Sequence, residues 1–325
     1  KYYIILFIIM KSKINLYTVK VEDVGNRIDK FFLKKNSQLS FSVIQKQIRT
    51  GYIKVNSLKV KANYKIQEKD IIQYGMSINF VYDVKNNTSI KKIYSEEIAR
   101  IKEKIIFEDN KLVALNKPSG IAVQGGSKIK LNIDLILPYL IESDEKLRLV
   151  HRIDKFTSGI LILAKTKEAS RKITKLFKEN KVKKKYWAIV LGAPKKEKGN
   201  IVLPLNKKFI SGQEKVVVDH DSEKHAETYY SIKEKTKKLS LLEIVPKTGR
   251  KHQIRVHLQS IENPILGDYK YYTRIDKVKY REKINMHLHA KELNFNIDGK
   301  DYSLSASLPQ YFKKTLIEKF RKKYD

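Results

Sequence analysis

The stretch LVHRIDKFTSGILILAKT, residues 149–166, holds a carboxylate in a setting that could support chemistry. Asp154 follows the basic pair His151–Arg152 and precedes the small residues of Thr157–Gly159, after which the apolar run ILILA begins. One interpretation is a strand whose edge carries a single turn carboxylate. The other is a catalytic aspartate at the mouth of a buried strand, which would hold the carboxylate rigidly. Both interpretations predict a strand over residues 160–164.

Arginine is scarce in this chain, which makes its positions informative. Only 11 of the 68 basic residues are arginine, yet TGRKHQIR contains Arg250 and Arg255, and Arg152 lies two residues before Asp154. A guanidinium is a planar fork that pairs with a carboxylate or phosphate through two hydrogen bonds and stacks on bases, which an ammonium cannot do. The pattern predicts sites that need this geometry. Chance clustering of a few arginines is the other explanation.

All seven histidines lie from residue 151 onward, which raises the question of a metal site. His252 and His257 are five residues apart, off the i, i+4 face that a helical metal pair needs, and no acidic cluster accompanies them. His287 and His289 could share one side of a strand, but no residue near them in the sequence completes a ligand shell. We predict no metal site and no cofactor, and histidines that hydrogen-bond or contact phosphate instead.

The composition favours a globular protein that binds a polyanion. Lysine and arginine number 68 against 35 acidic residues, the formal net charge is +33, and 42% of the residues are hydrophobic, enough for a sizeable core. Such a basic chain attracts nucleic acid through steering and counterion release, although an AT-rich genome would also enrich lysine. The absence of cysteine suits a reducing interior. We expect a cytoplasmic bacterial protein, or one of an organelle matrix, that is a monomer and binds no membrane.

The N-terminal third is predicted to contain a compact basic module. Residues 1–19 are interpreted as a leader, with a start at Met10, since the opening apolar run is about ten residues long against roughly 20 for a spanning helix. Residues 25–50 show two helical patterns, the second capped by Ser40, and alternation around Asn56–Ser57 predicts two short strands joined by a turn.

From residue 105 the pattern becomes that of a mixed α+β domain. IIFED and LVALNK read as strands, and a helix is predicted over KEASRKITKLFKEN, followed by the strand YWAIVLG. SLLEIVPKTGRKHQIRVHLQSI reads as a strand, a turn at Thr248–Gly249 and the start of a helix. These elements predict more hairpins than βαβ units.

Several of these segments resemble one family of enzymes that modify RNA. HRIDKFTSG resembles the HRLDxxTSG motif of the RluA/RluC/RluD family of pseudouridine synthases, with Ile153 in place of leucine. Four more segments resemble segments of this family and occur in the expected order, namely LVALNKPSGIAV, KKKYWAIVLG, PKTGRKHQIRVHLQSIENPILGD and MHLHAKELNF. The match covers about 90% of the chain. Asn263 departs from the residue that often precedes the Pro-Ile of the family.

The resemblance implies a fold and a domain organisation. The fold is α+β, a pseudouridine synthase fold with a mixed, largely antiparallel sheet, preceded by a small α/β S4 RNA-binding domain. We expect the S4-like domain over residues 20–85, a linker over 86–104 and the catalytic domain over 105–325. The implied reaction detaches uracil from C1′ of a uridine in RNA, turns it and reattaches it through C5.

The resemblance also implies roles for individual residues. Asp154 matches the essential aspartate, Arg255 the arginine that pairs with it, and Tyr186 the tyrosine that stacks on the base and assists proton removal. The target base cannot be reached inside a stack and must be flipped out. We predict further contacts to RNA from basic residues of both halves, namely His151, Arg152, Arg250, His252, Arg27, Lys30, Lys46 and Arg49.

The predicted function is the conversion of specific uridines to pseudouridine, most readily in large-subunit rRNA of the 23S type, because the S4 module accompanies ribosomal members. A synthase directed at tRNA is one alternative. A non-catalytic RNA-binding or ribosome-assembly protein on the same fold is another, but such a copy would be expected to lose Asp154, Tyr186 or Arg255. An RNA-cleaving hydrolase would need a second carboxylate or a histidine pair beside the aspartate, which the sequence does not place there.

Overall fold

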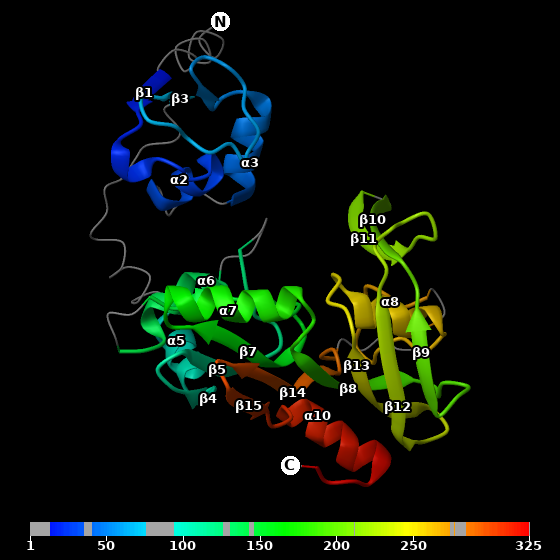
Figure 1. The fold of residues 1–325 in the computed structure, drawn as a ribbon. Coiled ribbons are helices and arrows are strands. Elements are labelled where there is room, and N and C mark those ends of the chain that lie inside the picture. Colours follow the sequence, from blue (N-terminus) through cyan, green and yellow to red (C-terminus); the bar gives the residue numbers. More distant parts are fainter. Residues whose placement is uncertain are drawn as a thin grey trace, which may run out of the picture. The chain divides into compact units, whose positions relative to one another are not determined.

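The chain divides into two compact units, Lys1–Ser95 with Gln124–Leu131, and Glu96–Val123 with Asn132–Asp325. The structure is a computed structural model that describes residues 14–35, 41–75, 94–125, 131–142, 146–210, 212–273, 276 and 284–324. The predicted start at Met10, the N-cap Ser40 and residues 86–93 of the predicted linker lie outside the described residues. Figure 1 draws the fold with its elements labelled.

The first unit is a small sheet with helices packed on it. Strand β3 pairs antiparallel with both β1 and β2. Its core contains Phe31 and Phe32 of α2, Ile44 and Ile48 of α3, and Ile72 of β3, all essentially fully buried. The two helices predicted within residues 25–50 are present, although Val43 of α3 is 40% exposed and does not belong to this core. The elements are β1 (Ile14–Thr18), the 3-10 helix η1 (Val21–Asp23), α2 (Ile28–Lys35), α3 (Phe41–Thr50), β2 (Lys54–Val55) and β3 (Ile71–Gly75).

The strand arrangement in this unit differs from the predicted hairpin. The turn at Asn56–Ser57 is present, with φ of 49° and 67°, and Val55 and Leu58 on either side of it exchange backbone hydrogen bonds of 3.0 and 2.9 Å. The predicted hairpin is limited to this one bridge, and both residues of β2 pair with β3. The buried Asp70 holds the intervening loop, since it accepts hydrogen bonds from Asn56 Nδ2 at 2.8 Å and Tyr64 Oη at 2.9 Å. Because these bonds organise the loop, the chain after the turn does not pair as the alternation suggested.

Two flanking segments that we interpreted as a leader and a linker contain secondary structure. Part of the predicted leader forms β1, which adds to the small sheet beside β3. Part of the predicted linker forms helix α5 (Ser95–Lys102), which buries Ile98 and Ile101. Alternating or i, i+3 apolar residues in these short segments were too few to stand out from the charged residues around them.

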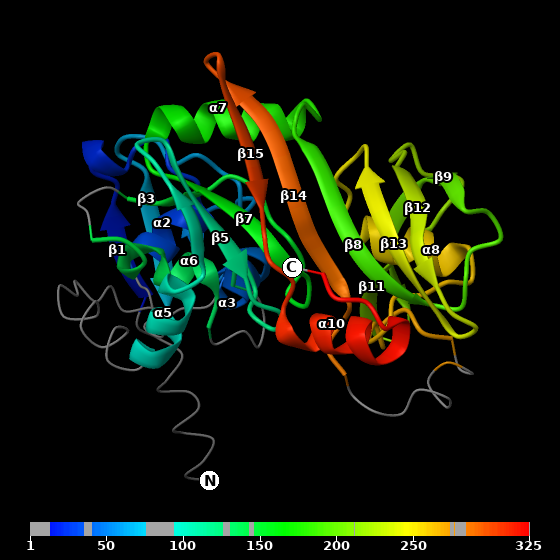
Figure 2. The same cartoon turned by 90° about the horizontal axis from the view of Figure 1, so that it is seen from below.

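The second unit is built around one large twisted sheet. Its neighbouring strands run in the order β4-β5-β7-β14-β8-β13-β12-β9, with β15 paired to β14 and β6 paired to β7. Every neighbouring pair is antiparallel except β7 and β14. Figure 2 shows the labelled strands from β5 to β9 side by side. The α+β class and the mixed, largely antiparallel sheet are confirmed.

The elements of this unit follow the predicted order from residue 105 onward. After α5 they are β4 (Ile105–Glu108), β5 (Leu112–Lys117), α6 (Ile133–Ile136), the 3-10 helix η2 (Leu137–Tyr139), β6 (Arg148–Leu149), β7 (Ser158–Ala164), α7 (Lys167–Lys178), β8 (Lys183–Leu191), β9 (Lys198–Val202), β10 (Leu205–Ile210), β11 (Gln213–Val218), β12 (Glu227–Lys235), β13 (Leu239–Pro246), α8 (Gln253–Ser260), β14 (Leu288–Ile297), β15 (Lys300–Ser305), α10 (Gln310–Thr315) and the π-helical turn η3 (Leu316–Phe320).

Helices cover both faces of the sheet, and the alternation of β8 shows which helix lies on which face. Ala188 and Val190 belong to a core cluster with Ile254 and Leu258 of α8. The intervening residues Trp187, Ile189 and Leu191 belong to a cluster that contains α10 and η3. Since successive side chains of a strand point to opposite faces, α8 and α10 lie on opposite faces. In the described part of the chain, no helix is long and apolar enough to cross a bilayer.

Candidate active site

Asp154 lies in the loop between β6 and β7, at the start of a strand whose seven residues are all buried. The loop closes with a backbone hydrogen bond from Thr157 N–H to the Asp154 carbonyl at 3.1 Å. Gly159 then has a φ of +105°, and a Cβ at this position would lie 2.3 Å from the backbone oxygen of Ala290. A side chain is therefore excluded where β7 meets β14, and the glycine allows the strand that carries Asp154 to pack directly against its neighbour.

Arg255, in the first turn of α8, contacts Asp154 and a second aspartate. Its Nη1 donates to Asp154 Oδ2 at 2.9 Å. Its Nε and Nη2 donate to the two carboxylate oxygens of Asp268, both at 2.7 Å. The predicted pairing of Arg255 with Asp154 is thus present in the structure, but the two-pronged partner of the guanidinium is Asp268. Because both Asp268 oxygens accept from Arg255, this carboxylate is not the second acid that a hydrolase would need.

The Arg255 side chain is only 6% exposed, and that of Asp268 only 2%, whereas that of Asp154 remains 26% exposed. Burial alone would lower the pKa of Arg255, but the hydrogen bonds and charge of Asp268, with a further contribution from Asp154, raise it above its usual value. Arg255 is therefore a permanent cation. Of the three side chains, Asp154 is the one that solvent, and hence a substrate, can reach.

His252 comes from the same end of α8 as Arg255 and also lies near Asp154. It precedes α8 in the left-handed conformation, with φ 55°, and its Nε2 is 3.8 Å from Asp154 Oδ2. Its Nδ1 is 2.6 Å from the Tyr271 hydroxyl. Burial lowers the pKa of His252 to about 4, against the opposing charge of Asp154. The imidazole is therefore neutral near pH 7.

Tyr186 reaches the site from β8 through the register of the sheet. Gly159 of β7 pairs with Ala290 of β14, and Ala290 pairs with Tyr186 of β8. Tyr186 thus lies in the same cross-strand row as Gly159, at the start of the strand that follows Asp154. Burial and the charge of Asp154 raise the pKa of Tyr186, so its hydroxyl keeps its proton. A neutral phenol beside the carboxylate can stack on a base and donate or relay a proton.

Lys117 is a component of the site to which we assigned no role from the sequence. It ends β5 opposite Gly159 and is fully buried. Its Nζ donates to the carbonyls of Pro118 at 2.9 Å, Ile121 at 2.9 Å and Lys155 at 3.2 Å. The Lys-Pro-Ser-Gly turn is thereby tied to the residue that follows Asp154. Burial lowers the pKa of Lys117 to about 7, although the charge of Asp154 acts in the opposite direction.

His151 has an internal role, which differs from the RNA contact that we predicted. Its Nε2 accepts the backbone N–H of Ile162 at 2.8 Å, and its ring stacks on Phe177 of α7 with the centroids 4.3 Å apart. On this edge of β7, β14 pairs only with Ser158 and Gly159. β14 therefore offers no backbone acceptor to the N–H of Ile162, and His151 takes that place. Burial, assisted by the charge of Lys184, lowers the pKa of His151 to about 3. The imidazole is a neutral structural acceptor.

The other predicted RNA contacts are mostly at the surface. Arg152 and Arg250 are exposed, and Arg250 Nε donates to the carbonyl of His225 at 3.2 Å. In the first unit, Lys30, Lys46 and Arg49 are exposed.

Arg27 is the exception among them, because its guanidinium is held by the buried Asp29. Nε and Nη2 of Arg27 donate to the two Asp29 oxygens at 3.1 and 2.6 Å. Gln45 of α3 donates to the same carboxylate at 2.9 Å. The side chain is 49% exposed, so it can still face a ligand, but its fork is already occupied.

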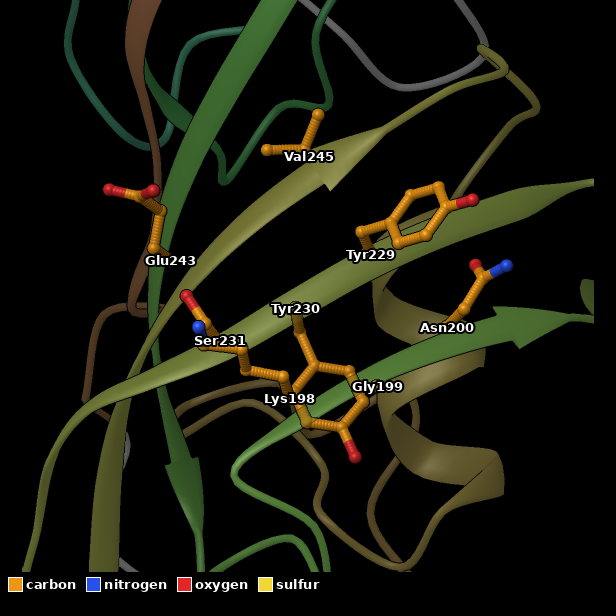
Figure 3. A pocket seen from close by; sticks show the side chains of 8 residues that line it. All are labelled: Lys198, Gly199, Asn200, Tyr229, Tyr230, Ser231, Glu243 and Val245. Atoms are coloured by element: carbon orange, nitrogen blue, oxygen red, sulfur yellow. The ribbon is translucent and has the colours of Figure 1, made fainter.

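Two depressions in the surface are lined by residues that do not belong to the Asp154 cluster. One, of about 420 Å³, lies over β9, β12 and β13, and Figure 3 shows Tyr229, Ser231 and Val245 among its lining residues. None of the predicted site residues lines it. The other, of about 570 Å³, is in the first unit and includes Lys46 and Arg49 of α3. Among the described residues, no group of three or more metal-ligating side chains comes together.

Comparisons with known proteins agree with this arrangement. The sequence profile of a family described as RNA pseudouridylate synthase matches residues 111–260. A protein of Rickettsia typhi named ribosomal large subunit pseudouridine synthase C is 37% identical over 296 residues, which cover 89% of this chain and 96% of the relative. A protein of the same name from Buchnera aphidicola subsp. Schizaphis graminum is 36% identical over 94% of this chain and 97% of its own.

The structural comparison extends the likeness to the fold. A solved structure titled human RNA pseudouridylate synthase domain containing 4 matches with a TM-score of 0.58 and 30% identity, over 69% of this chain and 96% of the other. The second unit therefore has the fold that the sequence motifs implied. No family profile identifies the first unit as an S4 domain.

Proposed function

The chain belongs to the family of RNA pseudouridine synthases, and from this premise we propose that it isomerises specific uridines of large-subunit rRNA of the 23S type. The names of its relatives from Rickettsia and Buchnera support this choice of RNA, as does their coverage of nearly the whole chain. The reaction exchanges the C1′–N1 bond of uridine for a C1′–C5 bond and leaves the composition of the RNA unchanged.

The observation that carries the proposal is the position of Asp154 against Arg255. The carboxylate accepts one N–H from a buried, permanently charged guanidinium at 2.9 Å and keeps its remaining surface toward solvent. A carboxylate that is oriented by a fixed cation and accessible is what an attack on the base, or assistance at the sugar, requires. We assign Asp154 as the catalytic aspartate and Arg255 as the residue that orients it.

Tyr186 is proposed to act on the uracil ring. It shares a sheet row with the start of β7, and its raised pKa keeps the hydroxyl protonated beside Asp154. Such a phenol can stack on the flipped base and, once the new bond has formed, relay the C5 proton by accepting it on its oxygen while passing its own proton to a neighbouring acceptor. Arg152 is proposed to fill the gap that the base leaves in the RNA or to clamp the backbone there.

The first unit is proposed to add contacts to RNA phosphates in the manner of an S4 domain. Lys30, Lys46 and Arg49 project from two adjacent helices, and the last two line the depression on α3. Arg250 and His252 are proposed to contact RNA near Asp154. Because the Arg27 fork is bound to Asp29, we propose that Arg27 contributes its charge and not a two-pronged phosphate contact.

A map of pseudouridines in the RNA of the host, with and without this protein, tests the function. We expect one or more sites in the large-subunit rRNA to disappear and to return with the parent protein but not with Asp154→Asn. The asparagine is isosteric, so binding of in vitro transcribed rRNA should stay within about threefold. If pseudouridines disappear from tRNA alone, the substrate is tRNA and not rRNA. An unchanged map would contradict the proposal.

A further inference from the structure

We infer that Tyr271 is a positioning residue for the reaction, because its side chain contacts both His252 and Arg255, the two residues at the start of α8 that face Asp154. This inference rests on the proposed function, since it concerns how Asp154 is held ready. Tyr271 is 3% exposed and lies in the turn after Asp268, where its backbone N–H donates to the Asp268 carbonyl at 3.0 Å. It was not among the residues that the sequence singled out.

The hydroxyl of Tyr271 sets the orientation of His252. The oxygen is 2.6 Å from His252 Nδ1, the only polar contact that the described residues make to this nitrogen. Burial raises the pKa of Tyr271 well above its usual value, so the phenol keeps a proton to donate. When Nδ1 accepts that proton, a neutral imidazole must carry its own hydrogen on Nε2. Nε2 is the nitrogen that faces Asp154, at 3.8 Å.

The ring of the same tyrosine supports Arg255. The guanidinium carbon lies 4.9 Å from the ring centroid, within the range in which a cation is attracted to an aromatic face. Asp268 fixes the guanidinium in its own plane through two hydrogen bonds, and the ring of Tyr271 limits its movement out of that plane. The remaining N–H is then directed at Asp154.

The two contacts have one consequence for the carboxylate. Asp154 faces a cationic N–H from Arg255 and, on our assignment, an N–H from His252, both held by the turn that contains residues 268–271. The charged groups that act on His252 are Asp154, Arg255, Lys270 and Lys251, and burial keeps the ring neutral among them. Loosening Tyr271 would let both donors move while the fold of β7 stays intact.

The experiment compares Tyr271→Phe with the parent, using transcribed large-subunit rRNA as the substrate. The phenylalanine keeps the ring under Arg255 and removes only the hydroxyl. We expect kcat to fall about fivefold, in the range for one lost hydrogen bond that orients a reacting group, while KM and RNA affinity change by less than about twofold because His252 is one of many proposed RNA contacts. Tyr271→Leu, which also removes the aromatic face, should lower kcat further.

Tyr302→Phe is the matched control. Tyr302 is also 3% exposed, and its hydroxyl donates to Asp109 at 2.8 Å in the β15 region, among residues that we do not assign to the site. Both variants should lower the melting temperature, but only Tyr271→Phe should lower kcat. Equal kcat values for Tyr271→Phe and the parent, or equal losses in both variants, would overturn the inference.

A second readout does not depend on turnover. In protein labelled with ¹⁵N-histidine, with the signal assigned through His252→Gln, the parent should show the Nε2–H tautomer of His252. Tyr271→Phe should mix the tautomers and raise the pKa of His252 by up to about one unit. An Nδ1–H tautomer in the parent would refute the positioning role. Failure of the parent to form pseudouridine in any RNA would refute the proposed function alone.

Discussion

Arg255 and Asp268 form a buried, two-pronged ion pair, with both N–O distances at 2.7 Å. The two residues are 13 positions apart and come from α8 and the turn that follows it. Because Asp268 occupies Nε and Nη2, Arg255 presents Nη1 to Asp154 in one direction. The orientation of the candidate catalytic carboxylate therefore depends on a second carboxylate that is itself out of reach of the substrate.

Asp268→Asn tests this dependence. The asparagine keeps the shape but removes the charge that balances a guanidinium only 6% exposed, and breaking a buried ion pair costs about 3–5 kcal/mol. We expect a loss of stability near the lower end of that range, because Asp154 still compensates part of the charge, and a fall in kcat of at least tenfold. Urea denaturation and single-turnover assays measure the two effects. A variant with parental kcat would show that Asp268 does not orient Arg255.

Arg255→Lys separates geometry from charge. Lysine keeps the positive charge but loses the fork that binds Asp268 and Asp154 together. A misplacement of about 1 Å can cost on the order of a hundredfold in rate, so we expect turnover to fall at least tenfold with little change in RNA affinity. Lys172→Arg, at a surface position paired with Glu168 and Asp298, is the control that should change neither. Parental turnover with weaker RNA binding would make Arg255 a phosphate contact.

Salt dependence tests the basic helices of the first unit. Replacing Lys30, Lys46 and Arg49 by glutamine should weaken binding to rRNA and flatten the slope of log K against log salt by about 0.7–0.9 for each phosphate contact that is lost. Filter binding at several salt concentrations measures the slope. The control for charge alone is a double variant that carries Lys172→Gln and Lys300→Gln and so removes two surface lysines of the second unit. An unchanged slope in the triple variant would mean that these residues do not contact phosphate.

Stability should fall as the medium becomes mildly acidic. Burial lowers the pKa of His151 to about 3 and those of His252, His287 and His289 to about 4, below the unfolded value near 6.5. Below pH 6.5 the unfolded chain binds more protons than the folded one. The stability from these groups is therefore fully present above about pH 6.5 and is lost as the pH falls toward the folded values.

The free energy of unfolding should accordingly drop between pH 7 and pH 5 by up to about 1.4 kcal/mol per pH unit for each such histidine. Urea denaturation at several pH values measures the slope, in a window above the titration of most carboxylates. His151→Gln keeps an acceptor for Ile162 N–H and removes one titrating group, so its slope should be smaller by up to one proton. A parent slope of zero across this window would contradict the assignment of buried neutral histidines.

The sequence by itself determined the local elements and the family. The apolar run ILILA predicted the strand β7, because a short continuous apolar run is typical of a strand that is buried on both faces. The helical spacing of Ile173, Leu176 and Phe177 predicted α7, because a period of 3.6 residues marks the buried face of a helix. The motif around Asp154 also led to Arg255, 101 residues away, which donates to Asp154 at 2.9 Å. It led as well to Tyr186, 32 residues away, which the sheet register places in the same row as Gly159 at the start of β7. These predictions rest on contiguous motifs, which a sequence displays directly.

The tertiary structure alone decided how those residues are held. Asp268 stood in the quoted segment PILGD, and Lys117 in LVALNKPSG, but their partners lie on other elements and no local spacing identifies them. The same limit explains His151, which turns inward because Ile162 has a paired strand residue, Ala114 of β5, on one edge of β7 and takes His151 as the acceptor for its N–H. Hydrogen-bond partners are set by which strands and helices meet, and that depends on the packing of the whole sheet. A single sequence gives the chemistry of each side chain, while its direction follows from the fold.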